Sequence, residues 1–104
     1  MKLIRWNEAK NELLRRERDV SFEEVLIAIG HGNLLDILEH HDKTKYQDQK
    51  IFIVNIGQYA YMVPFVETID ELFLKTIIPS RKATKKYLVD TQPKLTSKIK
   101  PKKK

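Results

Sequence analysis

Four basic side chains near the C-terminal end have types and a spacing suited to phosphate chemistry: Arg81, Lys82, Lys85 and Lys86. On a helix, residues four apart are neighbours, so these like charges repel each other unless something offsets them. An RNA phosphate can do so, with Arg81 stabilising the negative charge that develops at the phosphorus during cleavage. Taken alone, the residues predict either this phosphate-binding surface or a solvated helix with ordinary surface lysines.

A polar stretch before the central strands holds a second set of reactive side chains. His40 and His41 are adjacent there, and Lys50 closes the stretch. A neutral imidazole can accept the proton of a ribose 2′-hydroxyl, and a protonated one can donate to the leaving 5′-oxygen. Lys50 would place an ammonium group at the rim of a sheet, near the phosphate if that sheet binds RNA. Exposed histidines and a plain strand-end lysine are the alternatives, and with so few ligands we expect no metal and no other cofactor.

Aromatic side chains offer a way to hold bases, because stacking on a ring requires no base-specific hydrogen bonds. Trp6 and Phe65 are better explained as core residues. Tyr59 and Tyr61 share one face of a predicted strand, where either core packing or contact with bases fits. We select Tyr61 as the candidate base contact.

The net charge of +6 invites a nucleic-acid interpretation, but most of it lies at one end of the chain. Residues 89–104 contain six lysines and one acidic residue, which leaves 14 basic and 13 acidic residues in the first 88. A flexible basic end adds nonspecific attraction to RNA or only solubility. A local cluster inside the fold must therefore carry any argument about RNA.

Length and composition indicate one domain in a reducing compartment. A chain of 104 residues fits a single core, and there is no cysteine for disulfides, thiolate catalysis or a zinc site. No apolar run reaches the roughly 20 residues that span a membrane. We expect a cytoplasmic protein without membrane contact, with a folded domain over 1–88 and a disordered basic tail over 89–104.

Local patterns predict the elements that must position these side chains. Asn7 can cap a helix over 8–17, and Ser21 with Glu24 forms a capping box that begins the next helix. Ser80 can cap a short helix over 81–88, while Pro64 implies a sheet edge or a bulge in its strand. The remaining predicted elements are strands at 3–6, 34–38, 51–54, 59–63 and 72–78, with a hairpin connection at 55–58 and a loop at 39–50. These add up to an α+β fold: an antiparallel β-meander sheet with two N-terminal helices packed on it and a short C-terminal helix.

Three sequence segments, in order, are similar to the BrnT toxin family. They are Trp6-Asn7-x-x-Lys10-Asn11, then Val20-Ser21-Phe22-Glu23-Glu24, and finally Ile78-Pro79-Ser80-Arg81-Lys82-Ala83-Thr84. Together with the strands between them they span residues 3–88. The family is in turn similar to the RelE-type ribonucleases, which are compact α+β proteins encoded beside an antitoxin.

The resemblance implies a metal-independent endoribonuclease toxin that cleaves RNA and is covered by an antitoxin, expected to be of the ribbon-helix-helix type. Arg81 matches a basic position of the last motif, so the resemblance favours a catalytic role for it, with Lys50 as its partner at the phosphorus. The general base is either His41 or a residue that the sequence does not identify. The chain departs from the family pattern at Asn7, over 16–19 and at Gln49, where an acid, a K-H-G sequence and another acid are usual. These departures motivate an alternative: a catalytically inactive module of the same kind that binds antitoxin or nucleic acid in operon regulation.

Overall fold

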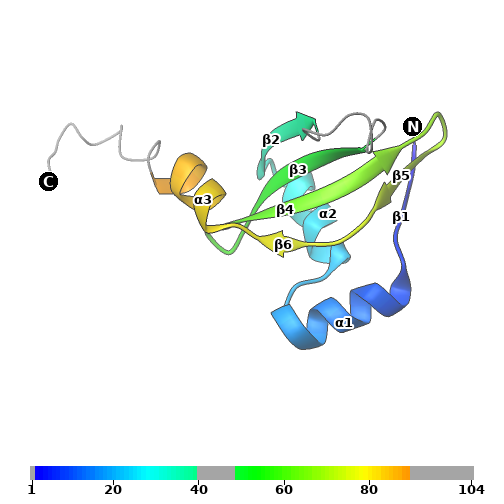
Figure 1. Cartoon of the computed structure of the whole chain (residues 1–104), viewed down its shortest axis with the longest axis horizontal. Coiled ribbons are helices and arrows are strands. Elements are labelled where there is room, and N and C mark those ends of the chain that lie inside the picture. The colour runs from blue at the N-terminus through cyan, green and yellow to red at the C-terminus, as the bar shows by residue number, and fades with distance from the viewer. Residues whose placement is uncertain (1, 40–48, 90–104) are drawn as a thin grey trace, which may run out of the picture.

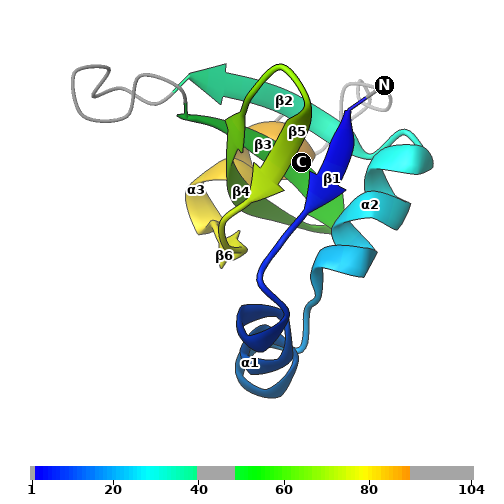
Figure 2. The same ribbon diagram turned by 90° about the vertical axis from the view of Figure 1, so that its right-hand side faces the viewer.

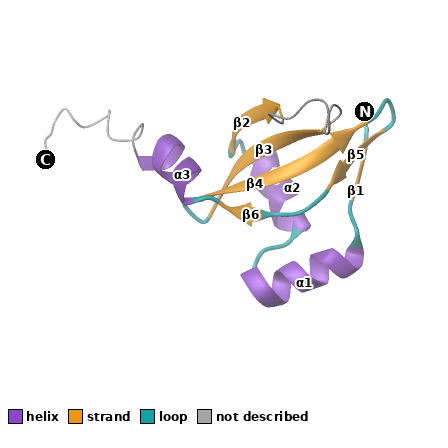
Figure 3. Ribbon diagram, viewed as in Figure 1, coloured by secondary structure: helices purple, strands orange, loops and turns teal. Residues whose placement is uncertain are grey.

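The computed structural model describes residues 2–39 and 49–89 and has an α+β fold. Its helices lie at two places: α1 and α2 on one side of the sheet, and α3 near one end of it (Figures 1 and 3). In chain order the elements are β1 (Leu3–Arg5), α1 (Glu8–Arg18), α2 (Phe22–Gly30), β2 (Leu34–Glu39), β3 (Gln49–Ile56), β4 (Tyr59–Glu67), β5 (Glu71–Leu74), β6 (Ile78–Pro79), α3 (Arg81–Thr84) and the π-helix η1 (Lys85–Val89).

The two N-terminal helices begin where the sequence predicts. The Asn7 side chain accepts a hydrogen bond from the Lys10 backbone N–H, and the capping box of Ser21 and Glu24 is complete. Between the helices, the buried carboxamide of Asn11 accepts from the Phe22 N–H at 2.8 Å and donates to Glu23 at 2.8 Å. This one side chain therefore fixes the start of α2 against α1.

The sheet is mixed, with strands in the order β1-β5-β4-β3-β2 and with β6 also paired to β4. The expected antiparallel meander is correct for β2 through β5, but β1 pairs parallel to β5, with Leu3 opposite Glu71 (Figure 2). Helices α1 and α2 connect β1 to the start of the meander. This long connection lets β1 lie at the edge of the sheet beside β5, the last strand of the meander.

The hairpin between β3 and β4 is tighter than the sequence suggested. Asn55 and Ile56, expected in the connection, belong to β3 and pair with Ala60 and Tyr59. Only Gly57 and Gln58 turn, with φ angles of 60° and 68°. Two successive positive φ angles are typical of the two-residue type I′ hairpin turn.

Pro64 lies inside β4, the central strand, opposite a break in the neighbouring strand. The single strand expected over 72–78 is in fact two strands, β5 and β6, with 75–77 between them. The Pro64 carbonyl accepts from the Lys75 N–H at 2.8 Å. The nitrogen of Pro64, which has no hydrogen to donate, lies on the same side of β4. The ladder is thus interrupted where proline has no donor to offer.

The sheet has one hydrophobic cluster on each face. The larger includes Phe22 and Val25 of α2 and, from the sheet, Val54, Val63 and Phe65. On the other face, Ala83 and Leu88 of the C-terminal helices pack with Ile53 and Ala60. Trp6 stacks on Phe22 and Phe65 on Phe52, as expected of core residues. We call the two faces the helix-pair face and the α3 face.

Candidate nucleic-acid interface

The position of α3 is fixed by hydrogen bonds to one residue of β4. Ser80 caps the helix, as the sequence predicts, by accepting from the Ala83 N–H at 3.0 Å. The Ser80 N–H donates to the Ala60 carbonyl at 3.0 Å, and the Ala60 N–H donates to the Thr84 hydroxyl at 2.8 Å. That hydroxyl donates in turn to the Ser80 carbonyl at 2.8 Å. Both backbone groups of Ala60 therefore anchor the helix beside the hairpin end of the sheet.

The outward side of this helical segment carries the predicted cations. Arg81, Lys82, Lys85 and Lys86 are all exposed, and we call them the α3 basic surface. The side chains of Arg81, Lys82 and Lys85 make no hydrogen bond or ion pair with any residue that the structure describes. The ammonium group of Lys86 lies over the ring of Tyr87, with its Nζ 5.2 Å from the ring centroid. The charges are available to an external anion.

A tyrosine–carboxylate contact holds η1 to the edge of the sheet. The Tyr87 hydroxyl donates to Oδ2 of Asp36 in β2 at 2.6 Å, and the Ile37 N–H donates to Oδ1 at 2.8 Å. The Tyr87 hydrogen bond is the main cause that lowers the pKa of Asp36, and the same bond raises the pKa of Tyr87. Each carboxylate oxygen of Asp36 thus accepts a hydrogen bond.

Lys50, expected to act with Arg81, lies far from it. It lies near the start of β3, opposite Phe65 and far from the β3–β4 hairpin. Helix α3 is anchored to Ala60, which lies opposite Asn55 near the other end of β3. Five residues of strand separate the two positions, which is about 17 Å. The side chain also points to the helix-pair face, where its Nζ lies 3.5 Å from Oε1 of Glu67. Lys50 and Arg81 do not share one site.

Tyr61 also lies apart from the basic surface. Residues alternate between the faces of a strand, and Tyr61 packs against the larger cluster while its neighbours Ala60 and Met62 belong to the cluster under α3. Its ring contacts that of Tyr59 edge-on, with centroids 5.7 Å apart, and burial raises its pKa. The structure gives Tyr61 a packing role on the opposite face. His40 and His41 are outside the described residues.

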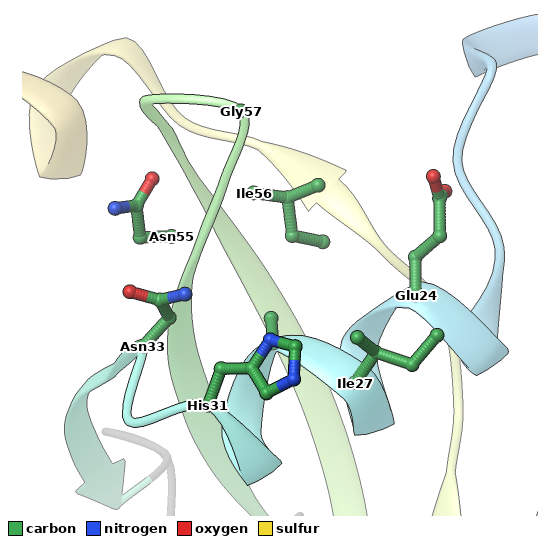
Figure 4. A pocket seen from close by; sticks show the side chains of 8 residues that line it. Glu24, Ile27, His31, Asn33, Asn55, Ile56 and Gly57 are labelled. Atoms are coloured by element: carbon green, nitrogen blue, oxygen red, sulfur yellow. The ribbon is translucent and has the colours of Figure 1, made fainter.

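A separate hollow of about 320 Å³ lies where α2 meets the β3–β4 hairpin, a place that the sequence did not single out. Figure 4 shows the carboxamides of Asn33 and Asn55 on one side of it and Glu24 on the other. Glu24 already accepts from the Ser21 N–H in the capping box, and the side-chain oxygen Oδ1 of Asn55 is buried with no hydrogen-bond partner among the described residues. Polar groups line this hollow, but none of the predicted site residues does.

Neither a metal site nor a membrane-spanning helix is found in the described part of the chain. Residues 2–39 and 49–89 contain no group of three acidic, histidine or cysteine side chains arranged to hold an ion. No helix within those ranges is both long enough and apolar enough to cross a bilayer. Comparison with known proteins found no matching family model, no matching curated protein and no matching solved structure.

One sequence signal would have marked the basic surface more sharply than the overall charge does. From Leu72 to Val89 there are five basic residues and no acidic one, whereas residues 1–71 hold nine basic and 13 acidic residues. The folded body is therefore net negative apart from this one segment, which is net positive by five. The near-zero net charge of the domain therefore hides a net negative sequence region and a net positive one.

Proposed function

We propose that this chain is a BrnT-like toxin that holds RNA on the α3 basic surface and cleaves it there. The observation that carries the proposal is the exposed group of Arg81, Lys82 and Lys85, which no described residue neutralises. Polyanion backbones are bound chiefly through such contacts, since each neutralised phosphate releases counterions. The α+β fold, with helices α1 and α2 on one side of a curved sheet, is consistent with the RelE-like arrangement expected from the resemblance.

The proposed reaction needs no cofactor. The ribose 2′-oxygen attacks the adjacent phosphorus, the bond from phosphorus to the 5′-oxygen breaks, and the products are a 2′,3′-cyclic phosphate and a 5′-hydroxyl. Arg81 stabilises the charge on the pentacoordinate phosphorus, and Lys82, Lys85 and Lys86 bind flanking phosphates. His41 is the proposed base that takes the 2′-hydroxyl proton, and the imidazolium so formed returns a proton to the leaving 5′-oxygen. Lys50 has no part in this centre, because it lies at the other end of β3.

Incubation of the purified chain with labelled RNA tests the proposal. We expect cleavage products with 2′,3′-cyclic phosphate ends, loss of cleavage in Arg81→Ala and unchanged cleavage in Lys50→Ala. Arg16→Ala, which removes an exposed arginine from α1 on the other side of the sheet, is the matched control. Intact RNA at enzyme excess, with an active ribonuclease as positive control, would exclude the nuclease.

A second candidate function is a non-cleaving module that binds RNA or an antitoxin and takes part in operon regulation. The separation of Lys50 from Arg81 favours it, because one expected catalytic partner is absent from the basic surface. Expression separates the two candidates. A nuclease toxin arrests growth and Arg81→Ala relieves the arrest, whereas a binding module leaves growth unchanged in both forms.

A ribbon-helix-helix antitoxin is the partner that the family resemblance implies, in the cytoplasm. We propose that it covers the same basic surface and competes with RNA. Co-expression with the product of the neighbouring reading frame, followed by purification of a complex, tests this. An antitoxin that binds wild-type chain but not a variant with Lys82→Glu and Lys85→Glu supports the proposal.

A further inference from the structure

The α3 face of the sheet continues beyond α3 as an apolar surface that no described element covers. The pairing register puts Pro64 and Val66 of β4 and Phe73 of β5 on this face, since they alternate with the helix-pair residues Phe65 and Leu74. Val66 and Phe73 belong to neither hydrophobic cluster and are partly exposed. Helix α3 reaches only the hairpin end, where it is bonded to Ala60 (Figure 1).

The charges on this same face fit an anionic occupant. Lys75 lies opposite Pro64, and its exposed side chain makes no hydrogen bond or ion pair with any described residue. The strands place two acidic residues on this face, and each has a partner: Asp36 is bonded to Tyr87, and Glu71 lies 3.0 Å from Arg5. Cations that no described acidic residue pairs with therefore border the apolar surface, from Lys75 at one side to Arg81, Lys82 and Lys85 at the other.

From this juxtaposition we infer that the open part of the α3 face is a stacking platform for the bases of single-stranded RNA, with Phe73 as its aromatic residue. The inference rests on the proposed function: the α3 basic surface binds the phosphates of the RNA, and the bases of the same RNA strand stack along the open part of the α3 face. Val66 lies six residues from Ala60 along β4, or about 20 Å, so the path spans several nucleotides. Lys75 contacts the backbone along it.

Unpaired bases are required because the two kinds of contact differ in chemistry. Cations bind the phosphates of any nucleic acid, single-stranded or duplex. An aromatic ring on the sheet can stack only on a base that is not already stacked inside a duplex. Phe73 thus replaces Tyr61 as the base-contacting aromatic, since Tyr61 lies on the helix-pair face. The platform makes the site selective for single strands over duplexes.

A tryptophan at position 73 reports on stacking directly. The double variant Trp6→Phe with Phe73→Trp has one tryptophan, at the platform, because Trp6 is the sole native one. We expect a short unstructured RNA oligonucleotide to quench its fluorescence with the same Kd that fluorescence anisotropy gives. A duplex of the same sequence should bind through phosphates without quenching. Binding by anisotropy with no quenching would overturn the platform and leave the RNA-binding function standing.

Substitution of Phe73 provides the affinity test. Phe73→Leu should raise the Kd for the oligonucleotide roughly tenfold, within the range seen when a stacking ring is removed, without changing the salt dependence. Tyr59→Leu, which removes a partly buried ring from the opposite face, is the matched control and should leave the Kd unchanged. Circular dichroism melting establishes that both variants fold. Equal Kd values for Phe73→Leu and wild type would contradict the platform, and failure of wild type to bind any RNA would overturn the proposed function itself.

Discussion

The Tyr87 hydroxyl lies 2.6 Å from Oδ2 of Asp36, and this contact joins η1, which carries part of the basic surface, to the edge strand β2. The contact occupies a carboxylate near Lys86, whose positive charge also lowers the pKa of Asp36. The Asp36 carboxylate, which would otherwise attract Lys86, thus holds η1 against β2 through Tyr87.

Removal of the Tyr87 hydroxyl should change the titration of Asp36. In the wild type the folded-state pKa of Asp36 is below that of the unfolded chain, so its contribution to stability is present above the unfolded pKa and is lost as pH falls through the folded pKa. Tyr87→Phe should bring the pKa of Asp36 back toward its ordinary value. Carbon-13 NMR of the side-chain carboxyls measures this. Glu67, whose pKa is lowered independently by Lys2, should titrate as before in the variant, and an unchanged Asp36 pKa would contradict the assigned cause.

The salt dependence of RNA binding should identify which cations meet phosphates. Lys82→Ala combined with Lys85→Ala should reduce the slope of log Kd against log salt by about 1.4, because each phosphate contact with a single strand contributes about 0.7. Fluorescence anisotropy between low and moderate salt provides the slope. Arg16→Ala serves as the control and keeps it. A double variant with the wild-type slope would place the RNA elsewhere.

Loss of the Thr84 hydroxyl should loosen α3. Thr84→Val keeps the shape of the side chain but removes the acceptor for the Ala60 N–H and the donor to the Ser80 carbonyl. We expect the free energy of unfolding to fall by about 1–2 kcal/mol, as for a partly buried hydrogen-bonded group. Urea denaturation measures it. Thr76→Val, at a partly buried threonine whose side chain makes no hydrogen bond with a described residue, should change stability by less than about 0.5 kcal/mol.

Asn11 should be among the most sensitive polar positions in the fold. It is fully buried, and its carboxamide serves both the Phe22 N–H and Glu23. Asn11→Ala leaves that N–H without a partner and raises the pKa of Glu23, which the Asn11 hydrogen bond lowers more than any other contact does. We expect a loss of about 2–3 kcal/mol in urea denaturation. Glu17→Ala, on the exposed side of the same helix, is the control, and equal stability of the two variants would contradict the role of Asn11.

Much of the fold could be predicted because its signals are local. Asn7, Ser21 and Ser80 each cap a helix through their own side chains, and those three helices begin where expected. The parallel pairing of β1 with β5 could not be foreseen, since it joins residues almost 70 positions apart with no turn to set the register. The break after β5 was missed for a related reason. Alternation over 72–78 indicates one strand, but Ile77 is buried in the larger cluster only because 75–77 leave the strand path.

The candidate site was predictable in composition but not in arrangement. Arg81 and its three lysines are adjacent in sequence, so any helix brings them together. Lys50 and Tyr61 were joined to them only by assuming a common surface, and strand alternation together with the length of β3 separates both residues from it. Alternation along the expected strand over 72–78 puts Phe73 and Lys75 on the same face. Whether that face is covered could not be predicted, because it depends on how far along the sheet α3 reaches.

The uneven distribution of charge gives the molecule a permanent electric dipole. Among the described residues, those before Leu72 carry more acidic than basic side chains, whereas the segment from Leu72 to Val89, which ends with α3 and η1, is net positive by five. In the field of a polyanion such a body rotates before it collides, so that the end with α3 arrives first. Productive encounters with RNA should therefore be more frequent than the near-zero charge of the folded body suggests, and this advantage should fade as ionic strength rises.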